Sequence, residues 1–210
     1  MRNLAETEEL DGFAVKLYFD ECPENPRREW DHVGTMRCWH PRYDLGDKAK
    51  GQECPDNHRD FVAWADAAGA IYLPLYLYDH SGLTMSTGRF SCSWDSGQVG
   101  WIYVLPDKVK KEYQVTEITA AVRDTVVKCL TAEVKEYDQY LTGQVYWYSI
   151  EDAEGESVDS CSGLFGLEYA RERAREAAKS CRAQADETAA TTACAVAQAE
   201  QDAWAMFGDS

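Results

Sequence analysis

Two cysteines and two histidines in the first third of the chain have the side chains that zinc prefers. Cys38 and His40 are separated by one residue, and Cys54 and His58 by three. The first spacing is tighter than the two to four intervening residues usual in structural zinc sites. Cysteine is also a common core residue. A structural role is therefore favoured for these residues, and a zinc site is the alternative.

Carboxylates and histidines of the same region provide a second set of metal candidates: Asp31, His32, His40, Asp44 and Asp47. Oxygen and imidazole ligands suit Mg²⁺ or Mn²⁺. They could bind one ion only if this segment folds back on itself. No cofactor is therefore predicted, and a divalent metal stays open.

Asp79, His80 and Ser81 are the three side-chain types of nucleophilic catalysis, but consecutive residues cannot adopt the geometry of a triad. With Gly82 they predict a turn instead. Histidine as a residue type suits a general base near neutral pH, and His80 could take this role with a partner from elsewhere such as Asp95. The candidates for catalysis are therefore His40, His80, Asp79 and Asp95, none with an assigned role.

The common enzyme signatures are absent from the sequence. It contains no GxGxxG, GxxxxGK[ST], HExxH, CxxC or GxSxG motif. These absences favour a non-enzymatic function without excluding an enzyme.

The chain is strongly acidic, with a net charge of −16. The densest excess lies in residues 133–159, where Lys135 is the one basic residue. Such a charge repels nucleic acid and attracts cations and basic proteins. We expect no direct binding of nucleic acid, and the alternative is a surface that only maintains solubility. The predicted partner-binding residues are Glu133, Glu136, Asp138, Glu151, Asp152, Glu154, Glu156 and Asp159.

Seven Trp and twelve Tyr residues, several of them clustered, are candidates for stacking on nucleotide bases. Aromatic residues at alternating strand positions more often pack across strands and in the core. We therefore favour packing, with a nucleotide-binding pocket as an alternative.

Short apolar and aromatic segments predict a mainly antiparallel sheet of about five strands. Turn signals among three of the central segments predict a meander, and Pro74, which has no N–H, predicts an edge position or a bulge. Residues 22–57 are expected to be irregular, with one short strand near residues 35–39. The other expected strands lie at residues 13–19, 71–78, 83–86, 99–105, 144–150 and near 157–161.

Helices are expected to cover this sheet. A short one is predicted at residues 61–70, ended by Gly69, and a long one at about residues 116–140, where apolar residues recur every three to five positions. After Gly166 neither Gly nor Pro occurs before Gly208, and 14 of the last 45 residues are Ala. This tail predicts a helix that packs on a neighbour, projects as a self-association arm or frays. The predicted fold is α+β, with a compact domain at residues 1–165 and a helical extension at residues 166–210.

The chain has no apolar run long enough to span a bilayer and no basic start followed by an apolar segment. We therefore expect a cytoplasmic protein whose eight cysteines are reduced thiols, mostly buried.

Three long stretches carry a resemblance: REWDHVGTMRCWHPRYDLGD (residues 28–47), LPLYLYDHSGLTMSTGRFSCSWDSGQVGWIYV (73–104) and EVKEYDQYLTGQVYWYSIED (133–152). The sequence resembles, over about residues 13–169, a family of uncharacterised proteins from bacteriophages and integrated mobile elements. No activity or catalytic residue of that family carries over. The resemblance implies a phage-type accessory protein acting in the cytoplasm of a bacterial host.

The negative charge and the bacteriophage setting that the resemblance implies together predict a function. We expect the protein to inhibit a host nucleic-acid-binding defence complex by nucleic-acid mimicry, as an anti-CRISPR or anti-restriction protein. Carboxylates can replace phosphates in a basic channel and release the same counterions. The partner is expected to be a basic protein or ribonucleoprotein complex. The alternatives are a metal-dependent hydrolase or nucleotide-modifying enzyme and a nucleotide-sequestering protein.

Overall fold

The structure, a computed structural model, describes residues 3–48 and 54–207, with the backbone alone for residues 203–207. In this part of the chain eight strands form two four-stranded antiparallel sheets, accompanied by five helices. The α+β prediction is confirmed, although the eight strands form two sheets and not the single sheet of about five strands that was expected. The chain divides into two compact units, unit 1 with residues 1–20 and 146–210 and unit 2 with residues 21–145. This division differs from the predicted boundary at residues 165 and 166, because the N-terminal strands and the C-terminal helix share one core.

Unit 2 contains the sheet β3-β6-β4-β5. Its strands are β3 (Thr35–Cys38), β4 (Ile71–Asp79), β5 (Leu83–Ser86) and β6 (Ser96–Val104), and its helices are α1 (Pro26–Glu29), α2 (Phe61–Ala67), α3 (Pro106–Glu112) and α4 (Ala120–Leu141). The region expected to be irregular holds α1 and β3, and its residues 49–53 lie outside the described residues.

The predicted meander is wrong in its order, because β6 returns beside β4 and not beside β5. The four residues of β5 pair only with the end of β4, whereas β6 pairs with β4 from Ile71 to Tyr78. This central position of β6 places Ile102 and Val104 in the core of unit 2, where both are buried. The β4–β5 hairpin itself is as expected.

Pro74 lies in an inner strand, so the edge prediction is wrong for β4 as a whole. However, β5 begins to pair only at Tyr76, and on that side of Pro74 no described strand requires an N–H. A register shift between Leu75 and Tyr76 supplies the predicted bulge.

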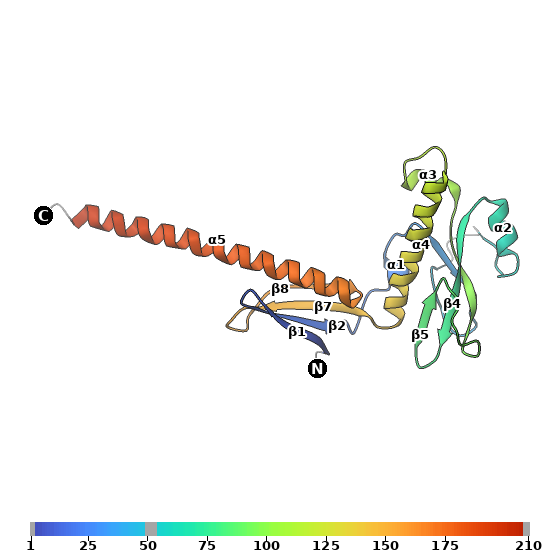
Figure 1. The fold of residues 1–210 in the computed structure, drawn as a ribbon, viewed down its shortest axis with the longest axis horizontal. Helices are drawn as coiled ribbons and strands as arrows, with labels where there is room; N and C mark the ends of the chain where they lie inside the picture. The colour runs from blue at the N-terminus through green and yellow to red at the C-terminus, as the bar shows by residue number, and fades with distance from the viewer. Residues whose placement is uncertain (1–2, 49–53, 208–210) are drawn as a thin grey trace. The chain divides into compact units, whose positions relative to one another are not determined.

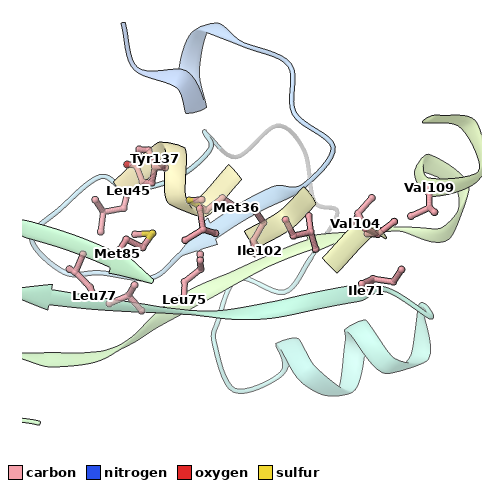
Figure 2. Close-up of a cluster of buried hydrophobic side chains, with 14 residues drawn as sticks. Met36, Leu45, Ile71, Leu75, Leu77, Met85, Ile102, Val104, Val109 and Tyr137 are labelled. Carbon is pink, nitrogen blue, oxygen red and sulfur yellow. The ribbon is translucent and has the colours of Figure 1, made fainter. Parts of the chain in front are cut away.

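Helix α4 covers one face of this sheet, as predicted (Figure 1). It begins at Ala120 after the cap Thr119, whose side chain accepts a hydrogen bond from the N–H of Val122. Val126, Leu130 and Val134 recur every four residues and are buried against the sheet. Figure 2 shows the resulting core, in which Met36, Leu75 and Ile102 point from the strands toward Tyr137 of the helix and its neighbours.

Helix α2 covers part of the other face with aromatic side chains. Phe61 stacks on Trp101 with ring centroids 5.2 Å apart, and Trp64 meets Tyr103 edge-on at 5.2 Å. These aromatic residues thus pack against one another, in agreement with the interpretation that was favoured for them.

Unit 1 contains the sheet β1-β2-β7-β8 and the long helix α5. The elements are β1 (Leu4–Leu10), β2 (Phe13–Phe19), β7 (Val145–Glu151), β8 (Ser157–Phe165) and α5 (Leu167–Phe207). Ala170, Ala174 and Ala178 of α5 are fully buried in the core that includes Val15 and Leu17 of β2. Beyond this contact, residues 182–202 are all exposed.

Two further observations concern the chain as a whole. All eight cysteines lie in the described part of the chain, and none of them forms a disulfide, but only Cys54 is buried, so the expectation of mostly buried thiols is wrong. None of the described helices combines the length and the apolar character needed to cross a membrane.

Candidate functional site

The eight predicted partner-binding carboxylates are distributed over both units, so they do not belong to one element. Glu133, Glu136 and Asp138 lie on α4 of unit 2, and the other five lie on β7, β8 and their turn in unit 1. Each group has a different environment.

Glu133 is not a surface residue, because it is 9% exposed and neutralised inside unit 2. Its carboxylate accepts a hydrogen bond from Nη1 of Arg27 at 2.9 Å and others from the N–H groups of Val33 and Gly34. Arg27 also forms a two-pronged contact with Asp47, at 2.7 and 2.8 Å. This network attaches the segment after α1 to α4 and has a structural role.

Glu136 and Asp138 are half-buried. Burial raises the pKa of both carboxyl groups. For Asp138 this is opposed by a hydrogen bond of 2.7 Å that Oδ1 accepts from the N–H of Met85. Asp138 therefore fixes β5 to α4, which leaves little of its carboxylate for a partner.

The carboxylates of unit 1 differ among themselves. Glu151 pairs with Lys16, and Asp159 accepts a hydrogen bond from the hydroxyl of Tyr148 at 3.1 Å. Asp152 accepts bonds from the N–H groups of Glu154 and Glu156, which shapes the β7–β8 turn. The side chains of Glu154 and Glu156 are exposed.

Strand register brings a second acidic turn next to this one. Ala14 of β2 pairs with Glu9 on one side and with Glu151 on the other. The β1–β2 turn and the β7–β8 turn therefore lie at the same end of the sheet, on strands about 10 Å apart. We call the carboxylates gathered here the acidic turn cluster: Glu9, Asp11, Asp152, Glu154 and Glu156.

The acidic turn cluster has no salt bridge of its own in the described chain, although Lys16, which pairs with Glu151, also attracts Glu9 at longer range. Within residues 3–48 and 54–207, none of its five members is in an ion pair, whereas all four arginines of α5 already pair with other carboxylates. Unit 1 has 18 acidic and 7 basic residues, and thus a net charge of −11 out of the −16 of the chain. The sequence prediction missed Glu9 and Asp11, although the Asp11-Gly12 pair just before the predicted strand at residues 13–19 is typical of a hairpin turn.

The four candidates for catalysis lie around one end of the sheet of unit 2. Nδ1 of His80 is 3.3 Å from Oδ2 of Asp95, the partner suggested from the sequence. The N–H of Asp79 donates to the backbone carbonyl of Asp95 at 2.8 Å. Sγ of Cys92, a residue not singled out from sequence, lies 3.9 Å from the same Asp95 oxygen. A thiol and an imidazole thus share one carboxylate.

His40 joins this region through Tyr43. Its ring stacks on Tyr43 with centroids 4.9 Å apart, and its Nδ1 accepts hydrogen bonds from the N–H groups of Arg42 and Tyr43. The hydroxyl of Tyr43 and the guanidinium of Arg42 both donate to Asp79. A cavity of about 490 Å³ borders this loop, lined in part by Cys38, His40, Arg42 and Tyr43.

The metal candidates are not brought together. Burial raises the pKa of the Cys38 thiol to about 12, which opposes the thiolate that zinc requires. His58 lies between Trp39 and Trp101, and Asp44 pairs with Arg28. Over the described ranges no three His, Cys, Asp or Glu side chains form a group that could hold a metal ion.

Comparison of the chain with protein-family models, with curated proteins and with solved structures finds no match. The functional argument therefore depends on the geometry of the acidic turn cluster and of the His80–Asp95 pair.

Proposed function

We propose that this chain is a non-enzymatic inhibitor that occupies the nucleic-acid groove of a basic host defence complex, of anti-CRISPR or anti-restriction type. The observation that carries the proposal is the acidic turn cluster, in which two neighbouring hairpin turns present five carboxylates that form no salt bridge with any described residue. The bacteriophage setting rests on the sequence resemblance.

The charge of unit 1 supports this mode of binding. A protein groove that binds phosphates is lined by Lys and Arg, and an array of carboxylates satisfies the same cations and releases the same counterions. Because Glu133 and Asp138 have structural partners and Glu136 is half-buried, the contact surface is smaller than the acidic run of the sequence. It is centred on Glu9, Asp11, Glu154 and Glu156.

Competition with DNA tests the proposal. The chain is titrated into restriction enzymes and RNA-guided nucleases bound to labelled target DNA, and displacement and cleavage are measured at several salt concentrations. We expect at least one enzyme of these classes to lose its DNA, with inhibition that weakens as salt rises. If none of them is displaced at low salt, the proposal fails.

A pair of matched variants separates a specific surface from net charge. The quadruple variant Glu9→Gln, Asp11→Asn, Glu154→Gln and Glu156→Gln removes four charges from the acidic turn cluster. The control Glu21→Gln, Glu24→Gln, Glu112→Gln and Glu117→Gln removes four exposed charges from unit 2. Inhibition should drop by tenfold or more in the first and change little in the second, and equal losses would contradict a localised surface.

The His80–Asp95 contact favours one second candidate, a hydrolase or nucleotide-modifying enzyme. An imidazole oriented by a carboxylate is the arrangement of a general base, and Cys92 or a water molecule would be the nucleophile. Hydrolysis of phosphate-ester and acyl-ester substrates should then fall by about 100-fold or more in His80→Ala. The exposed Glu117→Gln variant is the control, and the absence of any turnover that depends on His80 removes this candidate.

A further inference from the structure

A loop of unit 2 returns to β3 and borders a cavity. Residues 39–46 form this loop, which ends at a bridge between Arg37 and Gly46 and at a hydrogen bond of 2.9 Å from the N–H of Asp47 to the carbonyl of Met36. The cavity has a volume of about 490 Å³, within the range of sites that bind small organic molecules. We call it the β3 loop cavity.

Both carboxylates in the lining of the β3 loop cavity already have cationic partners outside it. Asp47 accepts hydrogen bonds from Nε and Nη2 of Arg27 at 2.7 and 2.8 Å and from the N–H of Met36 at 2.9 Å. Asp44 pairs with Arg28 at 3.0 Å. These two carboxylates therefore do not neutralise the cations that line the cavity with them.

Two cations of the lining have no close acceptor. Lys48 forms no ion pair with any described residue. Nε of Arg37 is buried and has no hydrogen-bond partner in the described chain, and its Nη2 is 4.0 Å from the exposed carboxylate of Asp56, which is longer than a hydrogen bond. Arg42 differs from them, because it pairs with Asp79. The cavity thus has uncompensated positive charge in a chain of net charge −16.

His40 adds a hydrogen-bond donor to this lining. Its Nδ1 accepts hydrogen bonds from the N–H groups of Arg42 and Tyr43, both at 3.2 Å. A ring nitrogen that accepts carries no proton, so the proton is on Nε2. Stacking on Tyr43 fixes the orientation of the ring. Since no described residue accepts from Nε2 of His40, this N–H is available to a ligand.

We propose that the β3 loop cavity binds a small organic phosphate, with Arg37, His40 and Lys48 as donors to the phosphate group. Three donors from separate positions of the lining suit the three terminal oxygens of a phosphomonoester better than the two oxygens of a carboxylate. Pro41 and the ring of Tyr43 supply apolar surface for the organic part. This inference does not depend on the acidic turn cluster, because the cluster belongs to unit 1 and the cavity to unit 2.

Calorimetric titration of the full chain tests the ligand class. The probes are AMP and ribose 5-phosphate, with adenosine and ribose as their unphosphorylated counterparts. We expect at least one of the two phosphates to bind at a single site, and its counterpart to bind at least about tenfold more weakly. The proposal is overturned if neither phosphate binds at millimolar concentration, or if each binds no better than its counterpart.

Matched variants locate the site. Lys48→Gln removes an exposed charge from the lining and Arg37→Gln a half-buried one, and each should weaken binding of the phosphate probe by about tenfold. Lys128→Gln removes an exposed charge of α4 outside the lining and should leave the affinity within about twofold. Thermal unfolding verifies that the variants fold. Equal effects of Lys48→Gln and Lys128→Gln would assign the binding to net charge and contradict a site in this cavity.

Nitrogen-15 NMR of the histidine rings tests the role of His40. The chain has four histidines, and the signal that is missing in His40→Gln identifies this one. The proton should be on Nε2 in the wild type, and the Nε2 signal should shift when the phosphate probe is added. An unchanged signal when the probe is bound would contradict the proposed set of donors.

Discussion

Arg27 is the residue that joins the irregular N-terminal segment of unit 2 to its main helix. Its side chain is fully buried and bonds to Asp47, Glu133 and the carbonyl of Gly34. Burial by itself would lower the pKa of the guanidinium, but the hydrogen bonds and charges of Asp47 and Glu133 raise it. The guanidinium therefore stays charged, and removing one of its carboxylate partners leaves this buried charge without full compensation.

Loss of one partner of this network should unfold the protein more easily. We expect Glu133→Ala and Arg27→Ala each to lower the free energy of unfolding by about 3–5 kcal/mol, measured by urea denaturation. Arg173→Ala, which breaks an exposed pair with Glu176 on α5, should cost less than about 1 kcal/mol. If Glu133→Ala lowered the free energy of unfolding as little as Arg173→Ala, the network of Arg27 would not be what attaches the segment after α1 to α4.

Asp138 makes stability depend on pH. Because burial raises the pKa of this carboxyl group in the folded state, folding favours its protonated form, and the contribution is lost as pH rises through the folded pKa. In Asp138→Asn the side-chain oxygen still accepts from the N–H of Met85, without a buried charge. Thermal unfolding should therefore show Asp138→Asn to be more stable than wild type at neutral pH and similar below about pH 4.

Lower stability of the asparagine variant at neutral pH would show that the charge of Asp138 strengthens the bond to Met85 more than burial penalises it. Glu117→Gln, on an exposed position before α4, is the control and should show no such pH dependence.

Helical spacing in the sequence indicates that Glu133 is buried, but the prediction grouped Glu133 with the exposed carboxylates because it considered charge alone. Glu133 follows Leu130 by three positions and precedes Tyr137 by four, so helical spacing places it on the buried face of α4. Its partner Arg27 is 106 residues away, and no local pattern identifies it. Asp95 was named from the sequence as one possible partner of His80, but the register of β4 against β6 is what brings the two side chains together.

At the scale of elements, β6 depends on the absence of a side chain at Gly100. A Cβ atom at this position would lie 2.0 Å from the carbonyl oxygen of Arg37 on β3. At Gly97, in the same strand, nothing lies within 4 Å of the added atom. The close approach of β3 and β6 therefore requires glycine at position 100 but not at position 97.

Alanine at the two positions should have opposite consequences. Gly100→Ala must displace β3 from β6, and we expect a loss of about 3 kcal/mol or more in unfolding free energy. Gly97→Ala meets no atom and should be neutral or stabilising by up to about 1 kcal/mol, because it restricts the unfolded chain. Chemical denaturation of both variants checks this, and a large loss in Gly97→Ala would contradict the register of β6.

Strands that are rich in apolar and aromatic residues were predictable from the sequence. A strand that forms only through its pairing with a neighbouring strand was not. Phe13–Phe19 matches the predicted strand, and the strand expected at residues 71–78 is one residue longer in the structure. β1, with three glutamates in seven residues, has no apolar alternation and forms because it lies at the edge beside β2. The long tail was predictable as a helix from its composition, whereas its contact with the first strands required the fold.

At the scale of the whole molecule, the negative charge is unevenly divided. Unit 1 has a net charge of −11 in 85 residues and unit 2 has −5 in 125 residues. Since the arginines of α5 are already paired, the excess in unit 1 is felt as repulsion among carboxylates such as those of the acidic turn cluster. A protein selected only for stability would place cations there, which makes the cluster a functional candidate.

This repulsion should be measurable without a partner. The Debye length is about 10 Å at 0.1 M salt and becomes shorter at higher salt concentrations. It is therefore comparable to the distance between the two turns, and added salt screens their repulsion. Amide hydrogen exchange of β2 and β7 should therefore slow as salt rises. The quadruple variant Glu9→Gln, Asp11→Asn, Glu154→Gln and Glu156→Gln should be better protected at low salt and respond less to salt.

The control for this measurement is the unit 2 variant Glu21→Gln, Glu24→Gln, Glu112→Gln and Glu117→Gln, which lowers the total charge equally. It should leave exchange in β2 and β7 nearly unchanged, because screening limits the repulsion to nearby carboxylates. Faster exchange of β2 and β7 at high salt would mean that the ion pairs of Arg171 and Arg175 with Glu6 and Glu8 outweigh the repulsion. In that case repulsion between the two turns is not the dominant charge effect in unit 1, which argues against the single anionic surface needed to replace phosphates.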